Sequence, residues 1–282
     1  MYIFGEGTPH TLVYDIGHDT WMPRSSKAFR KYLGGHSCAV TLGQKIFLFG
    51  GIGFGSPGRV QVYDTVADKW EMRKDMPWAS GGAGCAVIDG EVHVFGGTEF
   101  VPDKLKYPFG ETTYLHFSYN PVKDSWKRLE NMPITRSHMA AGADDKGRLW
   151  IFGGWNDEWE GVDDVYYYNT RNGADEWTGK GLALMDVAKG GMGNAVYLNG
   201  MFFMMGGQSA VDDHDAQSTG PEELVQVDVY DVEGDEWLLG EPMITPRTGV
   251  FPVGYNGDRL LVAGGSSYAR GGKSAANEVF FV

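Results

Sequence analysis

Cysteine is scarce in this sequence, because its 282 residues include only Cys38 and Cys85. Two cysteines are too few for a disulfide framework, which usually takes four or more. The sequence also lacks an Asn-x-Ser/Thr acceptor for N-glycosylation. These absences favour a reducing compartment, and we expect a cytoplasmic or otherwise intracellular protein.

Long apolar runs are missing as well. No stretch approaches the roughly 18 consecutive apolar residues of a membrane-spanning helix. The first residues do not combine a basic segment with an apolar one, as a secretory signal does. We therefore expect a soluble protein with no membrane span.

Positive charge is in deficit, with 24 Lys and Arg against 37 Asp and Glu and a formal net charge of −13. An acidic surface repels phosphate backbones, so we expect no nucleic-acid partner. Glycine is plentiful, at 42 residues, but follows no Gly-x-y period, which excludes collagen. Many glycines together with 13% aromatic residues predict short strands joined by tight turns.

A short apolar run that ends in two glycines recurs along the chain. The glycine pairs begin at positions 50, 96, 153, 206 and 264, at spacings of 46, 57, 53 and 58 residues. The opening string MYIFGEG is another copy, in which Glu6 stands in place of the second glycine. Self-similarity at such a period indicates a repeat architecture.

Two further markers accompany each glycine pair. A Trp follows an aromatic-Asp or aromatic-Asn pair in VYDIGHDTW, VYDTVADKW, SYNPVKDSW, YYNTRNGADEW and VYDVEGDEW. A small-residue strand and a turn that contains glycine precede the pair, as in AGCAVIDGE and GNAVYLNGM. Asn-Gly and Asp-Gly turns between apolar runs are hairpin signals, because both central residues adopt positive φ. Each repeat therefore predicts four antiparallel strands, A to D, which is the composition of a β-propeller blade.

We predict an all-β chain that forms one domain over residues 1–282, with six blades. The first blade lacks strand A, the last lacks strand D, and the four between them are complete. The predicted blades span residues 1–24, 35–77, 82–133, 138–182, 190–243 and 248–282. Large aromatic plates suit the space between blades, and the repeated tryptophans are predicted core residues: Trp21, Trp70, Trp126, Trp177 and Trp237.

The double glycine after an apolar strand, the Tyr-Asp pair and the spaced Trp together resemble the kelch-repeat β-propeller family, to which the central domain of galactose oxidase is similar. The family's Pro-Arg pair before strand A is matched by Pro246-Arg247 and in part by Thr135-Arg136-Ser137-His138. The resemblance covers nearly the whole chain. It implies a ring of six blades that closes with strands from both termini; a five-bladed ring and a piece of a longer chain are the alternatives.

The resemblance also implies a binding face, which in this family is formed by the B–C and D–A loops around the central channel. Aromatic residues and Arg dominate binding surfaces, and Arg binds carboxylates through two parallel hydrogen bonds. The candidate partner-binding residues are Arg24, Arg59, Trp78, Arg136, His138, Trp155, Trp159, Arg247, Tyr268 and Arg270. The alternative for Arg136 and Arg247 is that they brace neighbouring blades. His138, like His36, is expected to be a hydrogen-bonded scaffold residue, with proton shuttling as the alternative.

Two predicted B–C loops are long enough to be functional or disordered, and they span Thr98–Tyr114 and Gln208–Gln226. The second contains Asp-Asp-His-Asp from Asp212 to Asp215 but lacks the glycine and the final Glu of an EF-hand. We expect a solvated acidic loop, with a cation site as the alternative. Glu6 is expected to be a tolerated side chain, the alternative being a residue that lines the channel mouth.

Two enzyme types of the kelch family have residue requirements that this sequence does not match. A copper-radical oxidase similar to galactose oxidase needs a cysteine cross-linked to a tyrosine. Cys38 and Cys85 instead occupy equivalent places in successive repeats, which predicts small buried core positions. The iron motif of plant specifier proteins fails at its third position, where Tyr168 follows Glu160 and Asp164.

A sialic-acid-type sugar mutarotase is harder to exclude, because it needs only a carboxylate for proton transfer and an Arg for the substrate. Glu6, Glu99 or Asp157 with an arginine meets that need. The sequence has no Ser-His-Asp context, P-loop or zinc spacing. We therefore expect a non-catalytic scaffold that binds a protein or peptide and holds no cofactor or metal; the alternative is a carbohydrate-active propeller enzyme such as this mutarotase, with a sugar as its ligand.

Overall fold

A computed structural model describes residues 1–5, 9–26, 35–51, 58–99, 110–170, 176–209, 223–267 and 272–282. These residues form strands, turns and bends, with no helix among them. The described part of the chain therefore holds no helix long and apolar enough to cross a membrane. The predictions for Glu6, Tyr268, Arg270 and the stretch from Asp212 to Asp215 concern residues outside the described ranges.

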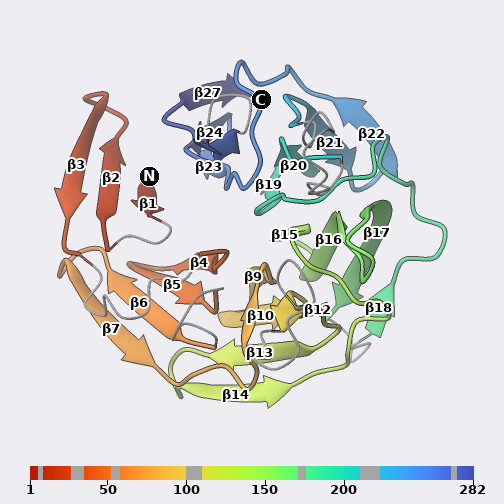
Figure 1. Cartoon of the computed structure of the whole chain (residues 1–282), viewed down its shortest axis with the longest axis horizontal. Coiled ribbons are helices and arrows are strands. Elements are labelled where there is room, and N and C mark those ends of the chain that lie inside the picture. Colours follow the sequence, from red (N-terminus) through yellow and green to blue (C-terminus); the bar gives the residue numbers. More distant parts are fainter. Residues whose placement is uncertain are drawn as a thin grey trace. The chain divides into compact units, whose positions relative to one another are not determined.

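Contacts within the chain group it into two compact units, Met1–Asn131 and Met132–Val282. Each unit contains three principal sheets, numbered 1 to 6 along the chain, and each sheet is antiparallel (Figure 1). The single domain over residues 1–282 stays a prediction.

The first unit contains sheets 1 to 3. Sheet 1 consists of β1 (Tyr2–Phe4), β2 (Thr11–Asp15) and β3 (Thr20–Arg24). Sheet 2 consists of β4 (Cys38–Leu42), β5 (Lys45–Phe49), β6 (Val60–Asp64) and β7 (Lys69–Arg73). Sheet 3 consists of β9 (Gly84–Ile88), β10 (Glu91–Phe95), β13 (His116–Asn120) and β14 (Ser125–Arg128). A small sheet combines β8 (Ser80–Gly81), β11 (Thr98–Glu99) and β12 (Glu111–Thr112).

The second unit contains sheets 4 to 6. Sheet 4 consists of β15 (Ala140–Ala143), β16 (Arg148–Trp155), β17 (Gly161–Asn169) and β18 (Glu176–Thr178). Sheet 5 consists of β19 (Val196–Leu198), β20 (Met201–Met205), β21 (Val227–Asp231) and β22 (Glu236–Leu239). Sheet 6 consists of β23 (Val253–Tyr255), β24 (Arg259–Ala263) and β27 (Asn277–Phe281). A two-stranded ribbon pairs β25 (Ser266–Ser267) with β26 (Gly272–Lys273).

The strand order in these sheets confirms the prediction from the repeats. Sheets 2 to 5 each have four strands, hydrogen-bonded in the order in which they occur in the chain. Sheet 1 has strands B, C and D, and sheet 6 has strands A, B and C. The pairs β8–β11 and β25–β26 were not predicted, and they lie in the B–C and D–A connections.

The turns between strands explain why the repeats carry Asn-Gly, Asp-Gly and aromatic-Asp pairs. In the A–B turn of sheet 5, Asn199 and Gly200 have φ values of 53° and 86°, which favour a hairpin whose twist matches that of its strands. In the C–D turn of sheet 2, Oδ1 of Asp64 accepts hydrogen bonds from the backbone of Val66 at 3.0 Å and Ala67 at 2.8 Å. Such side chain-to-backbone bonds are why Asp favours turns.

The middle strands of the sheets form the core of each unit. Four of the five residues of β5, β10 and β20 are buried, while all five residues of β3 are exposed. Strands buried on both faces read as continuous apolar runs, which accounts for the strings KIFLFGG and MFFMMGG. The core of the first unit includes Phe47, Val62, Val92 and Tyr119.

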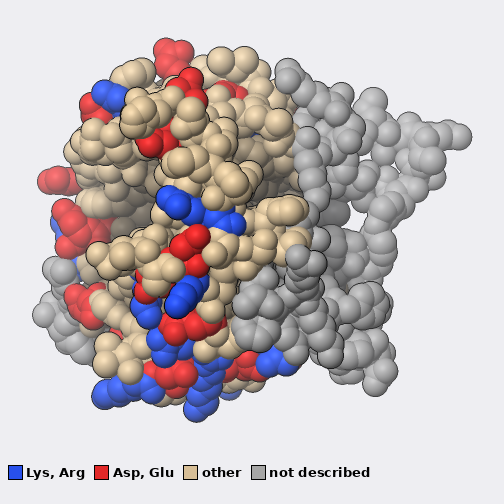
Figure 2. All heavy atoms as spheres, turned by 90° about the vertical axis from the view of Figure 1, so that its left-hand side faces the viewer, with Lys and Arg blue, Asp and Glu red and all other residues tan. Residues whose placement is uncertain are grey.

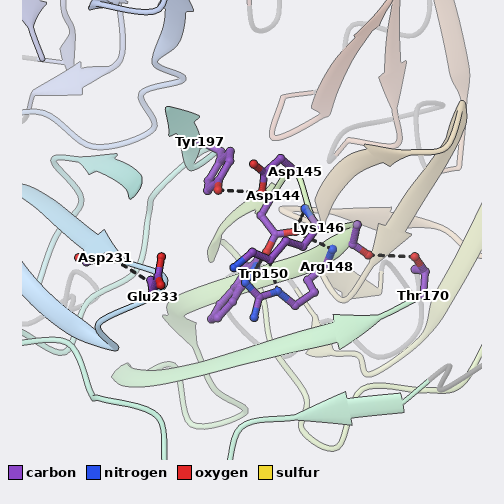
Figure 3. A network of polar contacts seen from close by, with 10 residues as sticks. Asp144, Asp145, Lys146, Arg148, Trp150, Thr170, Tyr197, Asp231 and Glu233 are labelled. Carbon is purple, nitrogen blue, oxygen red and sulfur yellow. Dashed lines mark hydrogen bonds and ion pairs between the residues drawn. The ribbon is translucent and has the colours of Figure 1, made fainter. Parts of the chain in front are cut away.

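A buried carboxylate fixes the A–B turn of sheet 4 (Figure 3). Asp144 accepts hydrogen bonds from the backbone and Nε of Arg148, at 2.8 and 2.6 Å, and from Nε1 of Trp150 at 3.0 Å. Tyr197 of sheet 5 donates to the neighbouring Asp145 at 2.9 Å. Because the Asp144 side chain is fully buried and so well supplied with donors, its role is structural.

Candidate functional site: the loop end of sheet 4

Sheet 4 extends further at its B–C end than the other sheets do. β16 has eight residues and β17 has nine, whereas strands B and C of sheet 2 have five each. The two strands meet in a tight turn over residues 156–160, and Ser137 of the D–A connection forms an antiparallel bridge with Trp155. The backbone around Arg136 therefore lies beside the end of β16.

Arg136 forms a mostly buried ion pair with a carboxylate of β17. Nη2 of Arg136 donates to Oδ2 of Asp164 at 2.7 Å, and only 3% of the Arg136 surface is exposed. Nε and Nη1 of Arg136 are also buried, but they have no hydrogen-bond acceptor. A buried donor without a partner is costly, by about 1–3 kcal/mol, and among the described arginines Arg136 has two such nitrogen atoms where four others have one each.

Arg136 has equivalents in three other sheets, each four residues after a buried methionine. Lys189 donates to the carbonyl of Gly206 at 3.0 Å and to Asp228, and Arg247 donates to the carbonyl of Gly264 at 3.0 Å and to Glu278 at 2.8 Å. In sheet 3 the hydroxyl of Ser80 donates to the carbonyl of Gly96 at 3.2 Å.

The acceptor in all three cases is the first glycine of a glycine pair, so this position normally ties the D–A connection to the end of strand B. Arg136 makes no such bond among the described residues. The donor groups of Arg136 are therefore not used for the structural hydrogen bond that the equivalent residues make.

Burial and the neighbouring acidic groups shift the pKa values around Arg136. Burial lowers the pKa of Arg136, and Asp164, Tyr166 and Asp157 oppose that shift. Burial raises the pKa of Asp164 even though the guanidinium lies beside it. The pKa of Tyr166 is raised by burial first and by Asp164 second. We call Arg136, Asp157, Asp164 and Tyr166 the Arg136 cluster.

The turn after β16 holds a tryptophan in an unusual backbone conformation. Trp159 has a φ of 62°, a region that bulky residues rarely adopt. Oδ1 of Asn156 accepts from the backbone of Glu158 at 3.0 Å and of Glu160 at 2.8 Å, which fixes the turn. The Trp159 ring is half-buried and lies 6.2 Å from the ring of His138. Strained residues held by their surroundings cluster at functional sites.

The other two predicted tryptophan anchors lie in the core. Trp78 is 6% exposed and stacks on Phe117 at 4.7 Å, and Trp155 is 3% exposed. A Cβ atom at Gly190 would lie 2.5 Å from the Trp155 ring, so the D–A connection covers that ring closely. These positions favour packing roles for both residues.

The predicted arginines occupy three kinds of environment. Arg247 is fully buried against Glu278, which favours the bracing alternative for it. Arg59 is partly exposed and paired with Asp75, and Arg24 is an exposed residue at the end of β3. The structure thus brings Arg136, His138 and Trp159 together at one end of sheet 4, while Arg24 and Arg59 belong to the first unit.

Sequence reasoning missed Lys189 and the acidic partners Asp228 and Glu278. The signal was present, because Lys189 lies four residues after Met185 just as Arg247 lies four residues after Met243. Both acids precede the aromatic residue of strand C by two positions. Among the described residues no group of three or more His, Cys, Asp or Glu side chains is placed to hold a metal ion.

Comparison with known proteins supports the fold. The family described as Kelch motif matches residues 34–77. The chain is similar to the solved structure of YjhT, with a TM-score of 0.79 over 97% of this chain and 88% of that chain, at 16% sequence identity. The chain carries a Kelch motif and has the fold of a β-propeller. The predicted kelch resemblance and the all-β propeller class are thus confirmed.

The curated relatives of this chain are longer proteins. Kelch-like protein terF of Aspergillus terreus is 25% identical over 239 residues, which cover 82% of this chain and 49% of that protein. Alpha-scruin of Limulus polyphemus is 25% identical over 176 residues, 57% of this chain and 18% of the scruin. Beta-scruin of the same organism is 26% identical over 214 residues, 73% of this chain and 21% of the scruin. The propeller spans about half of the first relative and about a fifth of the scruins.

Proposed function

We propose that this kelch propeller binds a protein or peptide partner at the loop end of sheet 4. The observation that carries the proposal is the pair of buried Arg136 donors without acceptors, next to the constrained and half-buried Trp159. Rigid scaffolds commonly present binding residues on loops, and Trp and Arg are the residues most enriched at binding hot spots.

The unpaired donors of Arg136 determine which chemical group a partner has to supply. The unpaired N–H groups of this guanidinium favour a negatively charged oxygen acceptor, such as the side chain of Asp or Glu or a carboxyl terminus. Because Nε and Nη1 are buried, the side chains around Arg136 have to move to admit the acceptor, which would approach beside Asp164, whose side chain is 30% exposed. Binding would then remove the cost of the unpaired donors, which favours the bound state.

Trp159 supplies the apolar part of the proposed site. Its turn is fixed by Asn156, so little conformational freedom of the backbone is lost on binding. The partner that fits is an extended peptide with an acidic group for Arg136 and an apolar side chain for Trp159.

Selection from a peptide-display library on the 282-residue chain tests this function. Affinities of the selected peptides are then measured for the wild type, Trp159→Ala and Arg136→Gln. Loss of a hot-spot residue should weaken binding by about 30-fold, equivalent to 2 kcal/mol. The control is Leu239→Ala, since Leu239 is 68% exposed on β22 and outside the cluster. Affinities that are unchanged in both Trp159→Ala and Arg136→Gln would refute the site.

A sugar mutarotase is the second candidate, and one observation favours it. The Arg136 cluster brings an arginine close to two carboxylates, and burial raises the pKa of Asp164 toward the range useful for proton transfer. Anomer exchange of a panel of acidic sugars, followed by NMR with and without the protein, decides this point. Exchange at the uncatalysed rate would remove this candidate.

A further inference from the structure

Cys38 and Cys85, the two cysteines of this chain, lie on neighbouring sheets at positions that differ by one residue. Cys38 pairs with Phe49, the residue before the glycine pair of sheet 2, and Gly84 pairs with the equivalent Phe95 of sheet 3. Cys85 therefore lies one position further along its strand than the residue equivalent to Cys38, whereas the spacing in the sequence predicts equivalent positions.

This offset by one residue turns the two side chains toward each other. Successive side chains of a strand point to opposite faces of a sheet, so Cys38 and Cys85 project from opposite faces of sheets 2 and 3. Opposite faces of these neighbouring sheets meet in the core of the first unit, which contains both cysteines together with Phe49 and Val94. The two thiols are free and lie within hydrogen-bonding contact of each other.

The strands that carry the cysteines, β4 and β9, are also in contact. The backbone N–H of Gly82 donates to the carbonyl of His36 at 2.7 Å, just before the two strands begin. Each strand lies at the edge of its sheet, so it is hydrogen-bonded to the sheet on one side only. The two strands can therefore shift toward each other, as a bond between the sulfur atoms requires, without breaking a second ladder.

We propose that Cys38 and Cys85 form a reversible disulfide bond that stabilises the first unit when the protein meets a peroxide. In the first step one thiol attacks hydrogen peroxide, the O–O bond breaks, and a sulfenic acid and one water are formed. In the second step the other thiol attacks the sulfenic sulfur, which forms the S–S bond and releases a second water. In total the two thiols give up two protons and two electrons, which reduce one peroxide molecule to two waters.

Burial determines how fast the pair reacts and which oxidants reach it. Burial raises the pKa of Cys85, and the hydrogen bond with Cys38 raises it further, so little thiolate is present at neutral pH. The cysteines are only 5% and 7% exposed, which favours a small oxidant. Figure 2 views the chain from the side on which β3 of the first unit lies in Figure 1, and basic and acidic side chains are interspersed there. This surface does not attract oxidants of one charge, and we expect slow oxidation by an uncharged peroxide.

The disulfide bond joins the first strands of sheets 2 and 3. It closes a loop that contains the rest of sheet 2 and the connection to sheet 3. Closing such a loop removes conformational freedom from the unfolded chain, so the oxidised protein should melt about 5–10 °C above the reduced one.

Thiol alkylation and peptide mapping of the 282-residue chain after treatment with hydrogen peroxide test the site. Catalase removes the remaining peroxide, urea unfolds the protein, and iodoacetamide then alkylates every thiol that is still free. We expect no alkylated cysteine, and proteolysis should give two peptides linked through Cys38 and Cys85. Dithiothreitol should restore both thiols and lower the melting temperature to that of the reduced protein, while any methionine sulfoxide stays unchanged.

The matched control is Cys38→Ala, because Ala140 occupies the equivalent place in sheet 4, opposite Phe152. The melting temperature of the peroxide-treated variant should not respond to dithiothreitol. Cysteines that both remain alkylated after peroxide treatment of the wild type would overturn the proposal, and so would a disulfide bond between two chains. A linked protein that melts no higher than its reduced form would also overturn it, because the bond would then not stabilise the fold.

Discussion

Two buried histidines in sheet 3 make the stability of this protein dependent on pH. Nδ1 of His116 lies 3.1 Å from the carbonyl oxygen of Glu130, and Nδ1 of His93 lies 3.0 Å from Nε2 of His116. Since a carbonyl only accepts, Nδ1 of His116 carries the hydrogen and Nε2 accepts from His93. Burial, together with repulsion from His93, lowers the pKa of His116 to about 3.

The sign of the effect follows from the two states of His116. Its pKa is about 6.5 in the unfolded chain, so below that pH the unfolded chain binds a proton that the folded protein does not. Stability is therefore complete above pH 6.5 and is lost as the pH falls toward 3. At 1.36 kcal/mol for each pH unit, the loss between pH 6.5 and pH 5 is about 2 kcal/mol.

The assay is urea unfolding at pH 7.0 and pH 5.0, a window above the ordinary pKa of carboxyl groups. His116→Gln keeps an amide that can donate and accept hydrogen bonds but cannot be protonated in this range. The variant should lose about 2 kcal/mol less than the wild type on acidification. His18→Gln is the control, because 81% of the His18 side chain is exposed. Equal losses in the wild type and His116→Gln would refute the reasoning.

Two other predictions concern packing and charge in the second unit. Glu278→Gln leaves the fully buried Arg247 without its ionic partner, and chemical denaturation should show a loss of about 3–5 kcal/mol; a loss under about 1 kcal/mol would contradict the assignment. Gly190→Ala places a Cβ 2.5 Å from the Trp155 ring and should cost about 1–3 kcal/mol in the same assay. Gly17→Ala, where the nearest atom is 3.5 Å away, is the matched control and should unfold at nearly the wild-type urea concentration.

Contacts between strands C and D explain why the repeats keep a Tyr, an Asp and a Trp at fixed distances. Tyr230 needs Asp235 for its buried hydroxyl, and Asp235 and Trp237 together hold Ala183 of the preceding sheet. Burial, and then the bond to Asp235, raises the pKa of Tyr230, so its hydroxyl stays a donor. The three residues therefore act as one unit that joins a sheet to the segment before it.

The predicted site and the structure differ most at the tryptophans, where burial decides whether a side chain is available for binding. Trp78, Trp155 and Trp159 look alike in the sequence, since each lies in a loop outside the repeated Trp positions. Only Trp159 keeps substantial exposure, because Phe117 covers Trp78 and the chain at Gly190 covers Trp155. Loop position alone does not reveal which residue from another strand packs over a side chain.

The sequence by itself determined the strands of the six principal sheets, their order in each sheet and the turns between them. These depend on interactions between residues a few positions apart, such as those of Asp64 with Val66 and Ala67, and such patterns repeat visibly along the chain. Tertiary structure alone decided the roles of the loop side chains. The partner of Arg136 lies 28 residues away, and Lys74 lies 50 residues from Asp124. Because such partners meet only when the sheets pack, these contacts became visible only in the folded protein.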